Sequence, residues 1–358
     1  MDLESFAESL AAPAVPPHLS WRPELVRPEP GERDALTRLC AAHGLTVVDT
    51  IERQAAELAA VRLPGASAAE RARYAAGVLG ERPEAYGTWV HLPWKARVVH
   101  VLAPEDYTAV VTARNQLKIT AAEQRVLARK RIGVIGLSVG GEAAVTLAQE
   151  HLCGRIALAD HDALDLSNLN RLGAGVDDLG LPKTRLAARR IALLDPYLEV
   201  ELHEDGVTPG NAAAFLDGLD LLVEECDGLA VKHLVRELAR DRGLDVVYAA
   251  DERGFLSVEP YSAHPGLALF HGLADGAAAR GPYLDGLVAW LGGADALSER
   301  SRRSLGLIGR DLSGYPQLAG EARFAAGLLA HVARRLLLGE PVPPFHGHLD
   351  LAELLPGT

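Results

Sequence analysis

The chain has 358 residues, of which 48% are hydrophobic and 23% charged, and its formal net charge is -12. This composition is typical of a globular protein with one large domain or two ordinary ones, and the negative charge argues against a nucleic-acid partner. We find no leader-like segment and no apolar run of about 18 residues, so we expect a cytoplasmic protein with no membrane span.

Residues 1–102 are interpreted as a small α/β extension of unknown role. Six prolines between Pro13 and Pro30 predict an irregular arm over about the first 35 residues. Apolar periodicity then predicts two helices, at 35–42 and 51–62. A short strand at 45–48 and a pair of strands within 86–102 are also expected, because the second segment is aromatic and β-branched.

Strands and helices alternate through the central domain, residues 103–262. After a helix expected at 121–130, the predicted strands are 131–135, 155–159, 198–204, 219–224 and 245–249. The predicted helices between these strands are 142–151, 183–194, 211–217 and 230–242. Connections of this length favour a doubly wound, mainly parallel sheet that is covered on both faces. The loops after the strands then gather at one edge, where ligands bind in such sheets.

Residues 263–358 are expected to complete this domain and to offer a surface for a dimer interface. Two helices are predicted here, at 284–291 and 321–338, before a Pro-rich tail that begins at Pro341. The second helix is apolar over much of its length, so we expect it to pack on the sheet or against another subunit.

A turn of small residues, GLSVGG at 136–141, lies between the first strand and the next helix of the sheet. Small residues let a phosphate approach the backbone, and a helix N-terminus supplies N–H groups and a positive dipole end. We assign Gly136, Ser138, Gly140 and Gly141 to this phosphate site. Ser138 stands at the second glycine of the usual G-x-G-x-x-G pattern, so the turn alone does not exclude a tight connection without a ligand.

Two acids follow the second strand of the sheet, Asp160 and Asp162. An acid at this point accepts hydrogen bonds from the ribose hydroxyls of a bound nucleotide. A ribose-binding role for Asp160 fits NAD as well as ATP. An acid that caps a helix or stabilises a turn would also explain the presence of Asp160 when it is considered alone.

Three polar residues that follow distinguish an ATP site from an NAD site: Asn168, Arg171 and Lys183. The sheet topology places both cations near the phosphates, where a nucleotidyl-transfer site must hold and spread negative charge. A hydride-transfer site has little need of them. A solvated loop and an ordinary helix start are the alternative explanations when each residue is taken alone.

An acidic tetrapeptide, EECD at 224–227, lies at the end of another predicted strand. Mg²⁺ prefers one or two carboxylates together with phosphate oxygens, and we choose Asp227 as its ligand, although an acidic helix cap is the alternative. Cys226 is interpreted as structural, because neighbouring acids disfavour its thiolate. No zinc is expected, since the three cysteines are far apart and form no C-x-x-C pair.

Taken in order, these segments resemble the ThiF/MoeB/ubiquitin-activating superfamily of adenylating enzymes. The likeness extends over residues 111–261 and is carried by RNQ at 114, VIGLSVGG at 134, LADHDALDLSNLNR at 158, GLPKTRLAARR at 180, LDPYLEV at 194 and LLVEECDGLAVK at 221. It implies a Rossmann-like, ThiF-type domain that uses ATP and Mg²⁺ to activate a free carboxylate as an acyl-adenylate. The carboxylate would belong to a ubiquitin-like protein, a peptide or a small acid.

The same resemblance implies roles for individual residues. Asp160 looks like the acid that binds the ATP ribose, and Asp227 like the Mg²⁺-binding Asp. Asn168 and Arg171 resemble the N-x-x-R pair near the phosphates, and Lys183 resembles the triphosphate lysine.

Arg114 resembles an arginine that the family supplies from the neighbouring subunit, which implies a homodimer.

The chain also departs from the family pattern. Ser138 and Val139 replace small glycines, Leu172 stands where Gln is frequent, and no cysteine follows Cys226. The resemblance therefore supports adenylation and not a thioester on the chain's own cysteine.

Two other functions remain as alternatives. A NAD- or FAD-dependent oxidoreductase shares the first βαβ unit, but it leaves Arg171, Lys183 and Asp227 without a role. A catalytically inactive ThiF-fold scaffold would explain the departure at Ser138 and Val139, yet it has no reason to retain the other polar residues.

Overall fold

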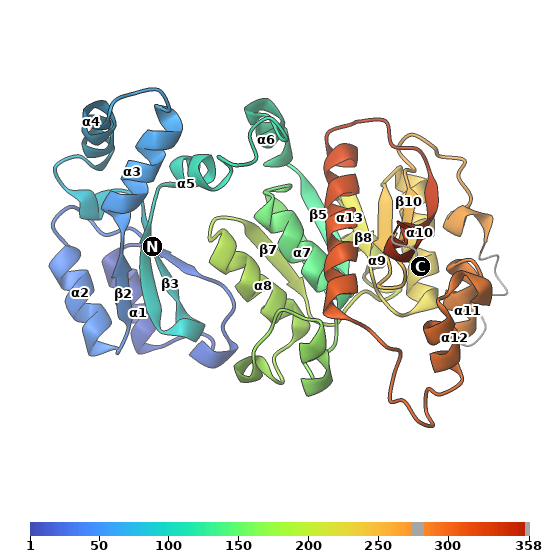
Figure 1. The fold of residues 1–358 in the computed structure, drawn as a ribbon. Coiled ribbons are helices and arrows are strands. Elements are labelled where there is room, and N and C mark those ends of the chain that lie inside the picture. Colours follow the sequence, from blue (N-terminus) through green and yellow to red (C-terminus); the bar gives the residue numbers. More distant parts are fainter. Residues whose placement is uncertain (274–282, 355–358) are drawn as a thin grey trace. The chain divides into compact units, whose positions relative to one another are not determined.

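The computed structural model describes residues 1–273 and 283–354. The chain forms two compact units, Met1–Ala121 and Ala122–Thr358 (Figure 1). In the described ranges, no helix combines the length and the apolar character that a bilayer crossing requires.

The N-terminal unit is built on a four-stranded sheet with the order β1-β3-β4-β2. Strand β3 pairs antiparallel with both β1 and β4, whereas β2 runs parallel to β4. The strands are β1 Glu24–Val26, β2 Thr46–Asp49, β3 Thr88–Leu92 and β4 Arg97–Val101. The helices are α1 Leu3–Ala11, α2 Arg33–Ala42, α3 Ile51–Arg62, α4 Ala68–Leu79 and α5 Pro104–Val111. The predicted helices at 35–42 and 51–62, the strand at 45–48 and the strand pair in 86–102 are thus confirmed.

The irregular arm expected over the first 35 residues is wrong, because this segment contains α1 and β1. Asp2 caps α1 by accepting a 2.8 Å hydrogen bond from the Ser5 amide. Phe6 and Val26 are fully buried and pack in one core cluster with Leu36, Cys40, Trp89 and Val98. Several of the prolines lie between α1 and β1, where they interrupt neither element. Burial of the two apolar side chains stabilises the elements, which proline content alone did not reveal.

The second unit is built on a seven-stranded sheet with the order β11-β10-β9-β8-β5-β6-β7. Strands β9, β8, β5, β6 and β7 are parallel, and β10 and β11 continue the sheet antiparallel. The strands are β5 Arg131–Ile135, β6 Arg155–Ala159, β7 Glu199–His203, β8 Leu221–Glu224, β9 Val246–Ala249, β10 Phe255–Glu259 and β11 Phe345–His348. The doubly wound, mainly parallel sheet is confirmed. The tail that begins at Pro341 is not wholly irregular, because β11 pairs with β10 there.

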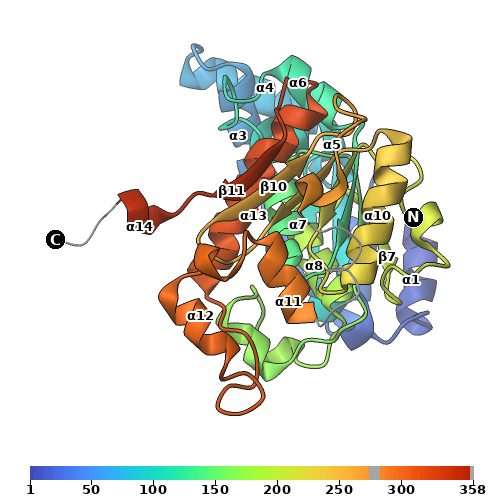
Figure 2. The same cartoon turned by 90° about the vertical axis from the view of Figure 1, so that its right-hand side faces the viewer.

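Helices cover both faces of this sheet. Helices α7, α8 and α13 lie on one face, and α9 and α10 lie on the other (Figures 1 and 2). The bounds are α6 Ala121–Leu127, α7 Val139–Gln149, α8 Lys183–Leu194, α9 Ala212–Phe215, α10 Leu229–Arg242, α11 Tyr283–Trp290, α12 Glu299–Leu305, α13 Ala319–Leu337 and α14 Leu351–Leu354. Helix α13 packs along α7 and against β8, β9 and β10, so the predicted packing of the apolar 321–338 helix on the sheet is confirmed.

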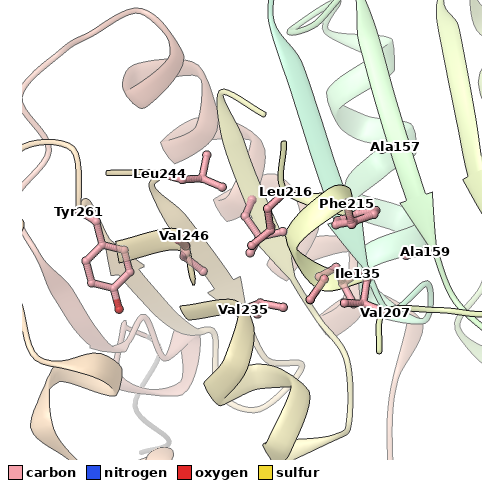
Figure 3. Packing of buried hydrophobic residues seen from close by; sticks show 13 residues of the cluster. Ile135, Ala157, Ala159, Val207, Phe215, Leu216, Val235, Leu244, Val246 and Tyr261 are labelled. Atoms are coloured by element: carbon pink, nitrogen blue, oxygen red, sulfur yellow. The ribbon is translucent and has the colours of Figure 1, made fainter. Parts of the chain in front are cut away.

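One hydrophobic core of the second unit lies between the sheet and helices α9 and α10. Ile135 and Val246 from the strands pack with Phe215, Val235 and other side chains of the same buried cluster (Figure 3). Each large apolar side chain that is fully buried contributes about 1.5–3 kcal/mol of transfer free energy. The central strands read as continuous apolar runs because both of their faces are covered.

The order of the strands defines a switch point between β5 and β8. From β5 the chain moves through α7 to β6 on one side, whereas β8 and β9 extend the sheet on the other side. In open sheets of this type, the ligand crevice lies where the winding direction reverses, beyond the carboxyl ends of the two strands. Gly136 follows β5 and Glu225 follows β8, so these two residues mark the crevice.

Candidate active site

A pocket of about 520 Å³ lies at the crevice between β5 and β8. Its polar end includes Ser138, Arg171 and Asp227, which come from three separate loops. The lining also includes Tyr248, Val288, Leu291, Leu297 and Leu305, which belong to or pack against one hydrophobic cluster and form the apolar end of the pocket. The structure therefore brings two of the predicted site residues together beside the glycine turn.

The glycine turn is shaped by its contact with the end of β8. Gly136 has φ +81°, and a Cβ at this position would lie 2.4 Å from the carbonyl oxygen of Glu225. A Cβ at Gly140 would lie 3.1 Å from the Cβ of Glu225. Helix α7 begins within this segment, at Val139, and the side chain of its N-cap, Ser138, makes no capping hydrogen bond. Because the first amides of a helix lack partners within it, this end of α7 suits a phosphate.

Asp160 holds the turn from the side of β6. Its Oδ2 accepts a 2.6 Å hydrogen bond from the Leu137 amide, and its Oδ1 accepts a 2.8 Å bond from the Asp162 amide. The side chain is buried. Carboxylate oxygens have several acceptor sites, so these bonds leave acceptor capacity for ribose hydroxyls. The ribose role of Asp160 stays a prediction.

Arg171 approaches the turn from the loop after β6. Its Nε donates to Ser138 Oγ at 3.3 Å, and its Nη1 donates to Asn170 Oδ1 at 3.0 Å and to the Ser167 carbonyl oxygen at 3.3 Å. Burial lowers the pKa of Arg171, and the carboxylates of Asp251 and Asp227 act in the opposite direction. A partly buried guanidinium whose hydrogen bonds go to neutral groups is well suited to an anionic ligand.

Lys183 lies on the β6 side of the turn. Its Nζ donates to Asp162 Oδ2 at 2.6 Å, and this bond lowers the pKa of Asp162. The two side chains are linked to Asp160 through the Asp162 amide. Lys183 is not among the described residues that line the pocket.

The two other predicted polar residues have different surroundings. Asn168 is buried, and its Oδ1 accepts a 3.0 Å hydrogen bond from the Asp165 amide, which caps the short helix Leu166–Asn170. Arg114 belongs to the N-terminal unit, where it is exposed in the turns after α5. The proposed ligand roles of both residues stay predictions.

Three acids of the pocket have no role among the predictions from the sequence: Glu225, Asp251 and Glu252. Burial raises the pKa of Asp251 to about 6 and raises that of Glu225 well above its usual range. Asp251 and Glu252 follow the predicted strand 245–249 after a single residue, Ala250. Their position after a strand of a parallel sheet was the signal that would have identified them.

A buried ion network supports the strand end that carries Asp227. Glu224 accepts a 3.1 Å hydrogen bond from Lys232 Nζ and pairs with Arg236, which also bonds Glu259 at 2.6 Å. Burial alone would raise the pKa of Glu224, but Lys232 and Arg236 hold it at about 2. Glu224 Oε1 also accepts a 2.9 Å bond from the Cys226 amide. The network thereby positions the backbone on which Glu225 and Asp227 lie.

The Cys226 side chain itself does not resemble a nucleophile. Burial and the neighbouring Glu224 carboxylate raise the pKa of its thiol well above the usual range. The thiolate, which is the reactive form, is therefore disfavoured, in agreement with a structural role.

Residues 112–261 match the model of the ThiF family. An uncharacterized protein of Mycobacterium tuberculosis (strain CDC 1551 / Oshkosh) is 42% identical over 275 residues, which are 75% of this chain and 38% of that protein. The probable adenylyltransferase/sulfurtransferase MoeZ of the same strain is 34% identical over 130 residues, 36% of this chain and 33% of MoeZ. The chain thus spans only about a third of the length of these curated relatives.

A solved structure also matches the chain. The structure of E. coli MccB with MccA-N7isoASN covers 67% of this chain and 71% of its own, with a TM-score of 0.50 and 16% identity. At this level of identity, the likeness shows a shared fold.

Proposed function

Residues 112–261 form a ThiF-family domain, and from this premise we propose that the protein is an ATP- and Mg²⁺-dependent adenylating enzyme. In the proposed reaction, a carboxylate oxygen attacks the α-phosphorus of ATP. The bond from this phosphorus to the oxygen that bridges to the β-phosphorus breaks, and pyrophosphate leaves. The carboxylate is already an anion near pH 7, so the reaction requires no protein base.

One observation carries the proposal: Arg171 and Asp227 line the same pocket beside Ser138 of the glycine turn. A cation and a carboxylate at the N-terminus of a helix form a suitable environment for a nucleoside triphosphate with its metal. Nucleotidyl transfer requires the alignment of two anions and the stabilisation of charge at phosphorus, and such a site supplies both.

Each residue then has a defined task. The Gly136–Gly141 turn and the first amides of α7 would hold phosphate oxygens, and Asp160 would accept from the ribose hydroxyls. Arg171 would stabilise the charge that develops on the phosphates. Asp227 would hold Mg²⁺, which neutralises phosphate charge when it is bound.

Lys183 and Arg114 have less direct roles in the proposal. Lys183 Nζ would have to leave Asp162 Oδ2, its partner at 2.6 Å, to reach a phosphate. Arg114 would act from a second copy of the chain, so the proposal includes a homodimer. The buried Asn168 would stabilise the loop that carries Arg171. Its side chain takes part in capping the short helix Leu166–Asn170, and Arg171 directly follows this helix.

The names of several relatives support a substrate with a free carboxylate. One is named a sulfur carrier protein adenylyltransferase, another a ubiquitin-like modifier-activating enzyme, and the MccB structure contains MccA. For this chain, the acyl substrate is proposed to be a protein or peptide C-terminus or a small acid.

Exchange of radiolabelled pyrophosphate into ATP tests the proposal, because it reports reversible adenylation without knowledge of the acceptor. We expect exchange that depends on Mg²⁺ and on an added carboxylate, in a screen that covers amino acids, other small acids and C-terminal peptides. Calorimetry should show binding of ATP with Mg²⁺. Binding of NAD in preference to ATP would contradict the proposal and favour an oxidoreductase.

A further inference from the structure

Asp251 is a buried carboxylate that the proposed nucleotide chemistry does not use. It lies in the turn between β9 and β10, it is 8% exposed, and it lines the pocket. Its side chain interacts with that of Gln317, but in the described part of the chain its Oδ2 has no hydrogen-bond partner. A buried polar atom without a partner costs free energy, so such an atom at a pocket indicates a missing ligand group.

The charges around Asp251 indicate the sign of that group. Among the described residues that line the pocket, Arg171 is the one cation, and it shares the pocket with Glu225, Asp227, Asp251 and Glu252. Outside the lining, burial and the charges of Asp251 and Glu252 raise the pKa of Glu321. This part of the pocket is therefore electronegative and favours a cation.

Glu252, the neighbour of Asp251, already has its own partners. Its Oε1 accepts a 3.0 Å bond from the Ser298 amide, and its Oε2 accepts from Ser301 Oγ at 2.6 Å and Tyr315 Oη at 2.7 Å. These bonds join the β9–β10 turn to residues 298–315, which form part of the pocket wall. Glu252 thus supports the wall, whereas Asp251 retains an oxygen for a ligand.

The apolar end of the pocket indicates what is attached to the cation. Tyr248, Val288, Leu291, Leu297 and Leu305 line this end. Such a surface favours an apolar group of the ligand. A second Mg²⁺ suits it poorly, because Mg²⁺ requires several oxygen ligands and usually retains water.

We propose that the carboxylate activated by this protein belongs to an apolar α-amino acid, whose ammonium group is bound by Asp251. This inference rests on the proposed adenylation and defines its substrate class. The substrate carboxylate would face Arg171 and the nucleotide, and the side chain would occupy the apolar end. A peptide or protein C-terminus would present a neutral amide N–H in place of the ammonium, and would therefore use the electronegative site less well.

A pair of stable adenylate analogues tests the ammonium separately from the rest of the ligand. The probes are 5′-O-(L-leucylsulfamoyl)adenosine and its des-amino counterpart, 5′-O-(4-methylpentanoylsulfamoyl)adenosine. They differ only in the amine. A hydrogen bond to a charged group contributes about 1.5–3 kcal/mol, so titration calorimetry on the full chain should show about tenfold or tighter binding of the leucyl analogue.

Asp251→Asn should remove most of this preference while it preserves the shape of the side chain. Asp241→Asn, which removes the same charge from an exposed position on α10, is the matched control and should retain the preference. The wild-type comparison does not depend on folding of either variant. It should give the same preference with EDTA, because the ammonium needs no metal.

The possible results distinguish the two proposals. Equal and tight binding of both analogues to the wild-type chain would overturn the ammonium site and leave adenylation intact. Loss of the preference in EDTA would show that the preference depends on a metal ion and not on the ammonium group, and it would overturn the inference as well. If neither analogue binds and ATP with Mg²⁺ does not bind, the adenylation proposal itself fails. An at least tenfold preference that Asp251→Asn removes and Asp241→Asn retains supports the inference.

Discussion

Gly136 and Glu225 meet backbone to backbone at the carboxyl ends of two neighbouring strands, β5 and β8. A Cβ at Gly136 would lie 2.4 Å from the Glu225 carbonyl oxygen, and Gly136 adopts φ +81°. Two requirements, space and a positive φ, therefore coincide at one residue. This contact forms the crevice from which the glycine turn and the acidic segment 224–227 face the same pocket.

Gly136→Ala should consequently destabilise the second unit and weaken ATP binding. The left-handed backbone alone costs about 1–3 kcal/mol for a residue with a side chain, and the clash with Glu225 adds to this. Thermal unfolding and ATP calorimetry would measure the two effects. Gly141→Ala is the stability control, because its Cβ would be 3.7 Å from the nearest atom, an ordinary contact. Equal stability of the two variants would show that the Gly136 contact is unimportant.

Arg171→Ala should lower pyrophosphate exchange by roughly 10²-fold or more, by analogy with the loss of one transition-state donor. Arg171→Lys keeps the charge but loses the fork of donors, so an intermediate rate is expected. Arg155→Ala, on an exposed side chain of β6 that pairs with Glu199, should leave the rate near that of the wild type. Exchange at the wild-type rate in Arg171→Ala would exclude the assigned role.

Arg236→Leu should destabilise the second unit by about 3–5 kcal/mol, because it leaves Glu259 and part of Glu224 as buried carboxylates without their partner. Denaturant unfolding of this variant and of a control, Arg310→Leu, would measure the loss of stability. Arg310→Leu removes an exposed ion pair with Asp311 and should change stability by at most about 1 kcal/mol. A similarly small change in Arg236→Leu would mean that the network is not required for the fold.

Asp251→Asn should stabilise the free protein at neutral pH although it weakens the proposed substrate binding. Burial raises the pKa of Asp251 from 3.8 to about 6, so the folded state binds the proton more tightly than the unfolded state. The stability of the wild-type chain therefore falls as pH rises from about 4 to about 6 through this group, and it changes no further above that range.

The amide cannot ionise, so the advantage of Asp251→Asn should approach up to about 3 kcal/mol at pH 8 and nearly disappear at pH 4. Urea unfolding at the two pH values would measure it. An advantage that is the same at both values would show that ionisation of Asp251 is not its cause.

The alternation of apolar segments and turns was enough to predict the doubly wound sheet, because buried parallel strands must be apolar on both faces. The glycine turn, Asp160 and Asp227 were also identifiable, since each lies directly after or close to the end of a predicted strand, and Arg171 was identifiable in the loop that follows Asp160. The folded helix and strand in the first 35 residues were missed, because their stability comes from the burial of Phe6 and Val26 in a core contributed by distant segments.

The amino-acid sequence by itself therefore determined the class of fold and the set of residues that gather at one edge of the sheet. Only the tertiary structure decided which of them share a pocket. It placed Arg171 and Asp227 together, paired Lys183 with Asp162, and gave one oxygen of Asp251 no hydrogen-bond partner among the residues that the structure describes. The physical reason is that local periodicity depends on neighbouring residues, whereas burial, ion pairing and the shift of a pKa depend on side chains that are distant in sequence.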